Sequence, residues 1–261
     1  MRRAVIVLSL LLSPIAARGA TLPGFSVEKI IETDGFLTCI VVDSHNEIIY
    51  STTDGGIFRV DAKTSVRLAS VPTAAEGNAA LLGIAMYDEG HVIAHYVAPD
   101  LQSDLVSMVD LADGSLVELA RFICDDGRVC SSEHHGGNPI VGPDGTIYVA
   151  MGDFGSGPRA QHAINPGGKI FRFKPGEEPK RIALGLRNPY DFALDAATGK
   201  FVVSDNGPMA GDEINLISEG DNAGWPYTWG YERALEGMLA PVYVFPETVA
   251  PTGLALISGR G

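Results

Sequence analysis

The sequence predicts an all-β protein of the β-propeller class, for three reasons. Short apolar runs are separated by turn residues along a chain of 261 residues that includes 31 Gly and 16 Pro, a pattern typical of strands joined by tight loops. No long stretch has the spacing of an amphipathic helix. The chain also contains an internal repeat of roughly 45 to 55 residues, which suits one four-stranded propeller blade.

Four stretches carry this repeat, and each reads as a strand, a turn with Asp or Gly, a strand, a loop and a strand. They begin at Leu37, Leu82, Pro139 and Asp191. Both faces of a blade pack against neighbours, so its strands should be apolar runs more than clean alternations. The alternative is a β-sandwich in which the similarity of the four units is coincidental.

We expect the propeller to occupy residues 20–261 and to be incomplete, with four to five blades present. A propeller protects its strand edges by closing into a ring. The apolar run 252–257 resembles the first strand of another blade with nothing following it. This pattern predicts a chain truncated at its C-terminus.

Residues 1–19 are predicted to be a signal peptide. Arg2 and Arg3 precede a short apolar run over residues 4–12, and small residues follow at 16, 17 and 19, as at a cleavage site. The apolar run is too short to span a bilayer comfortably, although an uncleaved anchor remains the alternative. We therefore expect a periplasmic or secreted protein with no membrane span after signal removal.

The net charge limits the classes of partner that the protein can bind, and the cysteines bear on its redox compartment. The formal net charge of −13 argues against nucleic acid, which is bound by clustered Lys and Arg. In an exported protein Cys124 and Cys130 could close a small loop, and Cys39 reads as a small buried hydrophobe.

The densest group of candidate functional residues lies between residues 133 and 153. His134 and His135 precede two glycines at the entry to an expected strand, and Asp153 follows the next strand. A histidine that faces the central channel could act as a general base near neutral pH, with Asp153 orienting it or stabilising its charge. A histidine that merely makes loop contacts is the alternative.

Three later runs add polar groups and an aromatic side chain. Arg187 offers donors for carboxylate or quinone oxygens, or else pairs with an internal acid, and Asn188 can donate to a carbonyl oxygen. Gly207 and Pro208 lie in an expected tight loop whose carbonyls could bind calcium, unless Asp and Asn side chains simply close the turn. For Trp225 we favour packing between blades over a role in a sugar site.

In order and spacing these runs resemble the soluble, PQQ-dependent glucose and aldose sugar dehydrogenases. The resemblance covers roughly residues 24–255; each motif is weak alone, but the ordered set is specific. The matching runs are Leu81–Ala85, His134–Gly137, Gly142–Gly145, Gly152–Asp153, Gly168–Arg172, Gly185–Pro189, Asp205–Asn215 and Asn222–Pro226.

The resemblance implies a six-bladed propeller that holds PQQ and a calcium ion over its central channel. It implies oxidation of an aldose at C1, with hydride transfer to the quinone and an external electron acceptor. His134 matches the general base, Asp153 matches the acid that supports it, and Arg187 matches a group at the reacting oxygens.

The same resemblance implies the cofactor contacts. Arg187 and Asn188 match groups at the quinone and sugar oxygens, and Asn78 stands where a Gln or Glu usually precedes the Leu-Leu-Gly run. Gly207 and Pro208 match the backbone carbonyl ligands of the cofactor calcium.

Several departures from the family pattern keep other functions open. Asn138 and Pro139 replace an Arg-Leu pair, Ala223 replaces a tyrosine, and the final blade, which supplies cations to PQQ, is expected to be missing. An acidic chain without those cations would repel the anionic cofactor. A propeller used only for binding is therefore one alternative. The other is a calcium-dependent lactone hydrolase that uses Asp205, Asp212, Glu213 and Asn215.

Overall fold

The computed structural model describes residues 29–33, 35–62, 64–124, 130–231 and 234–256. The predicted signal peptide lies outside the described residues. Within the described part of the chain, no helix is long and apolar enough to cross a bilayer. The helical segment η1 (Gly157–Gln161) is a short 3-10 turn.

The described strands form four antiparallel sheets, each of four strands that pair in sequence order. This arrangement confirms the all-β prediction and the blade repeat, since each predicted unit begins one sheet. The strands are β1 (Leu37–Val42), β2 (Ile48–Thr52), β3 (Gly56–Asp61) and β4 (Thr64–Ser70); β5 (Leu81–Met86), β6 (His91–Val97), β7 (Ser103–Asp110) and β8 (Leu116–Ile123); β9 (Ile140–Val141), β10 (Ile147–Met151), β11 (Lys169–Phe173) and β12 (Lys180–Leu184); β13 (Pro189–Asp195), β14 (Lys200–Asp205), β15 (Glu213–Ile217) and β16 (Tyr243–Val244).

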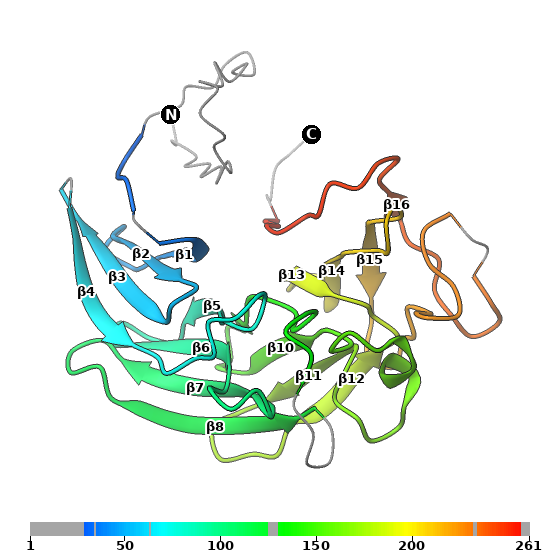
Figure 1. The fold of residues 1–261 in the computed structure, drawn as a ribbon, viewed down its shortest axis with the longest axis horizontal. Coiled ribbons are helices and arrows are strands. Elements are labelled where there is room, and N and C mark those ends of the chain that lie inside the picture. The colour runs from blue at the N-terminus through cyan, green and yellow to red at the C-terminus, as the bar shows by residue number, and fades with distance from the viewer. Residues whose placement is uncertain (1–28, 34, 63, 125–129, 232–233, 257–261) are drawn as a thin grey trace.

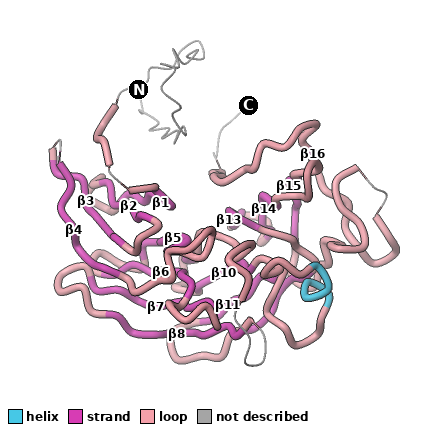
Figure 2. The backbone as a smooth tube through the Cα atoms, viewed as in Figure 1, coloured by secondary structure: helices cyan, strands magenta, loops and turns pink. Residues whose placement is uncertain are grey.

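The four blades follow one another around an arc (Figure 1 and Figure 2). Their first strands lie innermost, because β1 contacts β5, β5 contacts β9 and β9 contacts β13. The first and second strands of each blade are antiparallel. The loop that leads into the first strand therefore lies at the same end of the blade as the loop that leaves the second strand. The six-bladed type stays a prediction.

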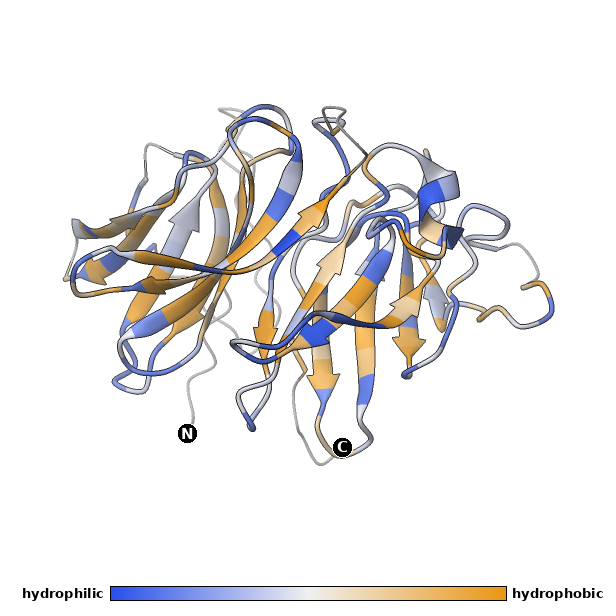
Figure 3. Cartoon of the chain, turned by 90° about the horizontal axis from the view of Figure 1, so that it is seen from below, coloured by the Kyte–Doolittle hydropathy of each residue, from blue (hydrophilic) through white to orange (hydrophobic). Residues whose placement is uncertain are grey.

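The core lies between neighbouring blades (Figure 3 shows the apolar strands). Ile57 of β3 and Ile84 of β5 belong to the cluster between the first two blades. Ile93 and Val149 belong to the next cluster, and Ile170 shares a third with residues of the last blade. Burying one such side chain stabilises the fold by about 1.5–3 kcal/mol, so blade stacking is the main source of stability.

Three further sequence expectations concern the cysteines and the last described segment. Cys124 and Cys130 form a disulfide, and Cys39 is a free thiol whose Sγ donates to the Ile84 carbonyl. The expected strand over residues 252–257 is wrong for its described part, because residues 252–256 pair with no strand. Instead the Leu254 N–H donates to Asp191 Oδ2 at 2.6 Å.

Candidate active site

A histidine–carboxylate pair occupies one end of the third blade. His134 lies in the loop before β9 and Asp153 follows β10, and the two positions meet because β9 and β10 are antiparallel. His134 Nδ1 lies 2.7 Å from Asp153 Oδ1. The His134 side chain is 15% exposed and that of Asp153 only 2%. The imidazole therefore reaches solvent while its carboxylate partner is buried.

The backbone around the pair is closely packed. His134 has φ 57°, a left-handed conformation that costs a non-glycine residue about 1–2 kcal/mol. Its carbonyl accepts the Phe154 N–H at 3.1 Å. A Cβ on Gly152 would lie 2.0 Å from the same carbonyl oxygen. Glycine is therefore required at position 152 for the two loops to come this close.

Asp153 is held by two further donors. Its Oδ1 also accepts the Gly155 N–H at 2.9 Å, and its Oδ2 accepts the indole N–H of Trp225 at 2.8 Å. Three donors thus converge on one buried carboxylate, which fixes its orientation toward His134. The sequence favoured packing between blades for Trp225, and the structure adds that its ring nitrogen completes this set of donors.

Arg187 lies on the other side of Trp225. Its Cζ is 5.6 Å from the centroid of the indole ring, within the range of a cation–π contact. Nη1 donates to the carbonyls of Asn206 and Gly207 at 2.8 and 3.1 Å. Within the described part of the chain, Nε and Nη2 of Arg187 have no hydrogen-bond acceptor, and these donors suit the oxygens of an anionic ligand.

Backbone hydrogen bonds join the loops of the third and fourth blades at this end. The Asp153 N–H donates to the Arg187 carbonyl at 2.7 Å, and the Gly136 N–H donates to Asn188 Oδ1 at 3.1 Å. The loops that bear His134, Arg187 and Gly207 therefore lie at the same end of the propeller, although 73 positions separate the first residue from the last.

The buried carboxyl of Asp205 binds the backbone of the Arg187 loop. Asp205 is 3% exposed and accepts the backbone N–H groups of Arg187 and Asn188 at 2.9 and 2.6 Å. Burial and the facing carboxylate of Glu213 raise the pKa of Asp205 to about 8, and burial raises the pKa of Glu213 as well. Burial therefore favours the neutral form of Asp205.

The acids named for a lactone hydrolase lie near one another, since Asp205 is opposite Glu213 in the β14–β15 pair, but their side chains are engaged in hydrogen bonds within the fold. Asp212 accepts the N–H groups of Gly207, Val249 and Ala250, and Asn215 donates to Glu213. In the described part of the chain, no group of three or more His, Cys, Asp and Glu side chains could hold a metal ion. These contacts weigh against that alternative.

The two carbonyls predicted to bind calcium already accept hydrogen bonds. Gly207 O faces Arg187 Nη1 at 3.1 Å, and Pro208 O accepts the Ala210 N–H at 2.6 Å. A calcium ion at Gly207 would lie beside the guanidinium charge and be repelled by it. In this arrangement the two residues do not fit a calcium ion by themselves, and the calcium assignment stays a prediction.

Asn78 lies beside the histidine loop. Its N–H donates to the Ser132 carbonyl at 2.9 Å, and the residue is exposed. Ser132 precedes His134 by two positions in the chain, but no described contact links the Asn78 side chain to Arg187. Its role in cofactor binding stays a prediction.

Sequence reasoning also missed an amide pair that holds Trp225. Gln161 of η1 and Asn222 exchange two hydrogen bonds of 2.9 Å, and Gln161 Nε2 donates to the Trp225 carbonyl at 2.7 Å. Asn222 is part of a run matched to the family, which was the available signal. No sequence signal marked Gln161, because its contact with Asn222 depends on where η1 lies in the folded chain.

The blades thus present a histidine–carboxylate pair and an arginine at the same end of the propeller. The family model described as glucose/sorbosone dehydrogenase matches residues 39–261, and the chain belongs to this family.

Individual relatives agree with this membership. The chain is 25% identical over 154 residues to the aldose sugar dehydrogenase YliI of Escherichia coli K12, covering 49% of this chain and 42% of the relative. It is 33% identical over 137 residues to quinoprotein glucose dehydrogenase B of Acinetobacter calcoaceticus, covering 41% and 28%. The chain thus spans less than half the length of either curated relative.

Among solved structures, the PQQ-bound aldose sugar dehydrogenase of Streptomyces coelicolor is similar. It superposes with a TM-score of 0.73 at 25% identity, over 84% of this chain and 70% of that one.

Proposed function

We propose that this chain carries the catalytic base of a sugar dehydrogenase that oxidises an aldose at C1, with PQQ as the cofactor and an external electron acceptor. The observation that carries the proposal is the His134–Asp153 pair, which lies beside the Arg187 guanidinium at one end of the blades. Family membership and the PQQ-bound relative support it.

The pair is suited to general-base chemistry. An ionised carboxylate only accepts hydrogen bonds, so the 2.7 Å contact assigns the proton of His134 to Nδ1. Nε2 then carries the lone pair and can take the proton of the C1 hydroxyl. Asp153 stabilises the imidazolium that forms, because its charge is buried next to the ring. Solvent can remove the proton later, since the ring is partly exposed.

Arg187 provides the positive charge for cofactor oxygens. When bound, PQQ supplies the acceptor for the two electrons that leave C1. Nε and Nη2 of Arg187 offer donors in a planar array that suits carboxylate or quinone oxygens, and the Trp225 ring and two carbonyls hold the guanidinium in place. Asn188 and Asn78 are the further cofactor contacts in this proposal, and calcium, which Gly207 and Pro208 do not fit alone, would need additional ligands.

The proposal places the protein in the periplasm or outside the cell. The Cys124–Cys130 disulfide supports this location, because such bonds persist mainly in oxidising compartments. The predicted signal peptide over residues 1–19 gives the route of export.

Dye reduction by the whole chain tests the proposed function. The protein is incubated with PQQ and Ca²⁺, and reduction of an artificial electron acceptor is followed with a panel of aldoses. We expect His134→Ala to lower kcat by about 10²–10⁴-fold, while PQQ binding measured by fluorescence stays unchanged. His91→Ala is the matched control, because His91 is a surface histidine that pairs with Asp88.

Each outcome separates the alternatives. Unchanged turnover in His134→Ala would remove the base assignment. PQQ binding without turnover by the wild-type chain would favour a binding module, and lactone hydrolysis without PQQ would favour the hydrolase. Loss of PQQ binding on chelation of Ca²⁺ would support the calcium prediction, and binding that is insensitive to chelation would contradict it.

A further inference from the structure

Next to the proposed site, three buried ionisable side chains form a separate cluster. His95 of β6, Asp104 of β7 and His135 have fully buried side chains. His135 Nδ1 lies 2.8 Å from Asp104 Oδ1, and His95 Nε2 lies 3.5 Å from Asp104 Oδ2. One carboxylate thus faces two imidazoles, and all three side chains are buried.

The partners of His135 define its protonation. Its Nε2 lies 2.7 Å from the Ser131 carbonyl, and a carbonyl can only accept. Since the Asp104 carboxylate also accepts, both ring nitrogens donate and His135 is an imidazolium. Burial opposes this charge, but the Asp104 carboxylate outweighs burial and raises the pKa of His135. Burial likewise opposes the charge of Asp104, yet His135 and His95 lower the pKa of that carboxyl.

His95 holds the opposite end of the same loop. Its Nδ1 donates to the Gly137 carbonyl at 2.8 Å. Its Nε2 and Asp104 Oδ2 are buried without a hydrogen-bond partner among the described residues. The two imidazoles around one carboxylate therefore hold the carbonyls of Ser131 and Gly137, and His134 lies between these two points in the sequence.

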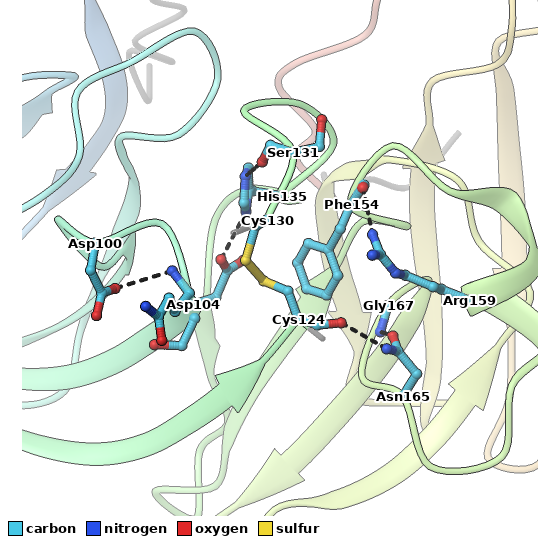
Figure 4. The surroundings of a disulfide bond; sticks show 12 residues. Asp100, Asp104, Cys124, Cys130, Ser131, His135, Phe154, Arg159, Asn165 and Gly167 are labelled. Carbon is cyan, nitrogen blue, oxygen red and sulfur yellow. Dashed lines mark hydrogen bonds and ion pairs between the residues drawn. A yellow bond between two sulfur atoms is a disulfide. The ribbon is translucent and has the colours of Figure 1, made fainter. Parts of the chain in front are cut away.

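The loop needs such support because its central residue is strained. The left-handed φ of 57° at His134 persists only where the surroundings enforce it. Figure 4 shows His135 between Asp104 and Ser131, with the Cys124–Cys130 disulfide immediately before Ser131 in the chain. The disulfide anchors the start of the loop, and the buried cluster fixes the rest.

We propose that Asp104 is a positioning residue for His134. Asp104 holds the Ser131 carbonyl through its hydrogen bond with His135, and its charge lies 3.5 Å from His95, which holds the Gly137 carbonyl. Asp104 thereby maintains the backbone that aims His134 at Asp153. The inference rests on the proposed function for the role of His134 as a base. The geometry it describes is independent of any cofactor or sugar.

Histidine ring NMR of the whole chain tests this inference without PQQ or substrate. In the wild type, the ¹⁵N shifts of the six histidines, assigned by single substitutions, should show His135 doubly protonated at pH 7. They should show His134 in the single tautomer with its proton on Nδ1. A neutral His135 at pH 7 in the wild type would overturn the inference, and this measurement needs no variant to fold.

The variant Asp104→Asn removes the charge with little change in shape. We expect a neutral His135, loss of the single tautomer of His134, and about tenfold faster solvent exchange of its Nδ1 proton, equivalent to about 1.4 kcal/mol of loop stabilisation. Ser107→Ala is the control, because Ser107 lies on the same strand and bonds only Tyr96. If the tautomer and the Nδ1 exchange rate of His134 stay unchanged in Asp104→Asn, or change equally in Ser107→Ala, Asp104 has no specific role in positioning His134. Neither result depends on whether His134→Ala loses turnover.

Discussion

Asp205→Asn should change how the stability of the protein depends on pH. Asp205 lies under the Arg187 loop, and its pKa is raised to about 8 by burial and by the facing Glu213. An unfolded chain would have the ordinary pKa of 3.8 at this residue. Between pH 5 and 7 the carboxyl is therefore protonated in the folded protein and ionised in the unfolded chain.

The sign and size of the effect follow from this difference. Because the folded state binds one more proton, the free energy of unfolding falls as pH rises, by about 1.4 kcal/mol per pH unit. From pH 5 to 7 the loss from one such carboxyl is about 3 kcal/mol, and because Asp205 and Glu213 face each other it belongs to the pair. Asparagine does not titrate, so the variant should lack this loss while keeping an oxygen for the Arg187 and Asn188 N–H groups.

Urea unfolding of both proteins at pH 5 and pH 7 measures the effect. Asp191, whose pKa burial raises to about 6, contributes equally to both proteins and cancels in the difference. Asp144→Asn is the control, because the pKa of that exposed carboxyl is about 2 and it does not titrate in this window. A difference below about 1 kcal/mol between wild type and Asp205→Asn would refute the reasoning, since Asp205 would then be ionised in the fold.

Two further predictions concern the support of the histidine–carboxylate pair. Trp225→Phe removes the indole donor to buried Asp153 and should lower the free energy of unfolding by about 1–3 kcal/mol, measured in urea; an unchanged value would mean that water replaces the indole. Gly152→Ala places a Cβ 2.0 Å from the His134 carbonyl oxygen and should cost about 1–3 kcal/mol. Gly90→Ala, which meets only one distant atom, should cost much less; equal losses would contradict the close-approach argument.

Much of the fold was predictable because the blades repeat. Each sheet recurs with similar strands and turns, so apolar runs and the turn residues between them mark every blade. The third blade illustrates this, since the predicted unit starting at Pro139 became β9 to β11. The fourth strand of each blade was less evident, because outer strands such as β4 are largely exposed and carry a weaker apolar pattern.

The candidate site was predictable only where a motif marked it. His134, Asp153 and Arg187 lay in recognisable runs, and the structure brings them together. Trp225 was in such a run too, but whether its ring would pack or donate depended on where Asp153 lay. Asp104 belonged to no motif at all.

The sequence by itself determined the strand order, the family and the loops that bear polar residues, because these depend on local propensity and on motifs read along the chain. Tertiary structure decided that Trp225 donates to Asp153, that burial raises the pKa of Asp205, and that Asp104 faces two histidines. Each of these depends on burial and on contacts between residues far apart in sequence. Such contacts follow from how the blades pack, which no local pattern encodes.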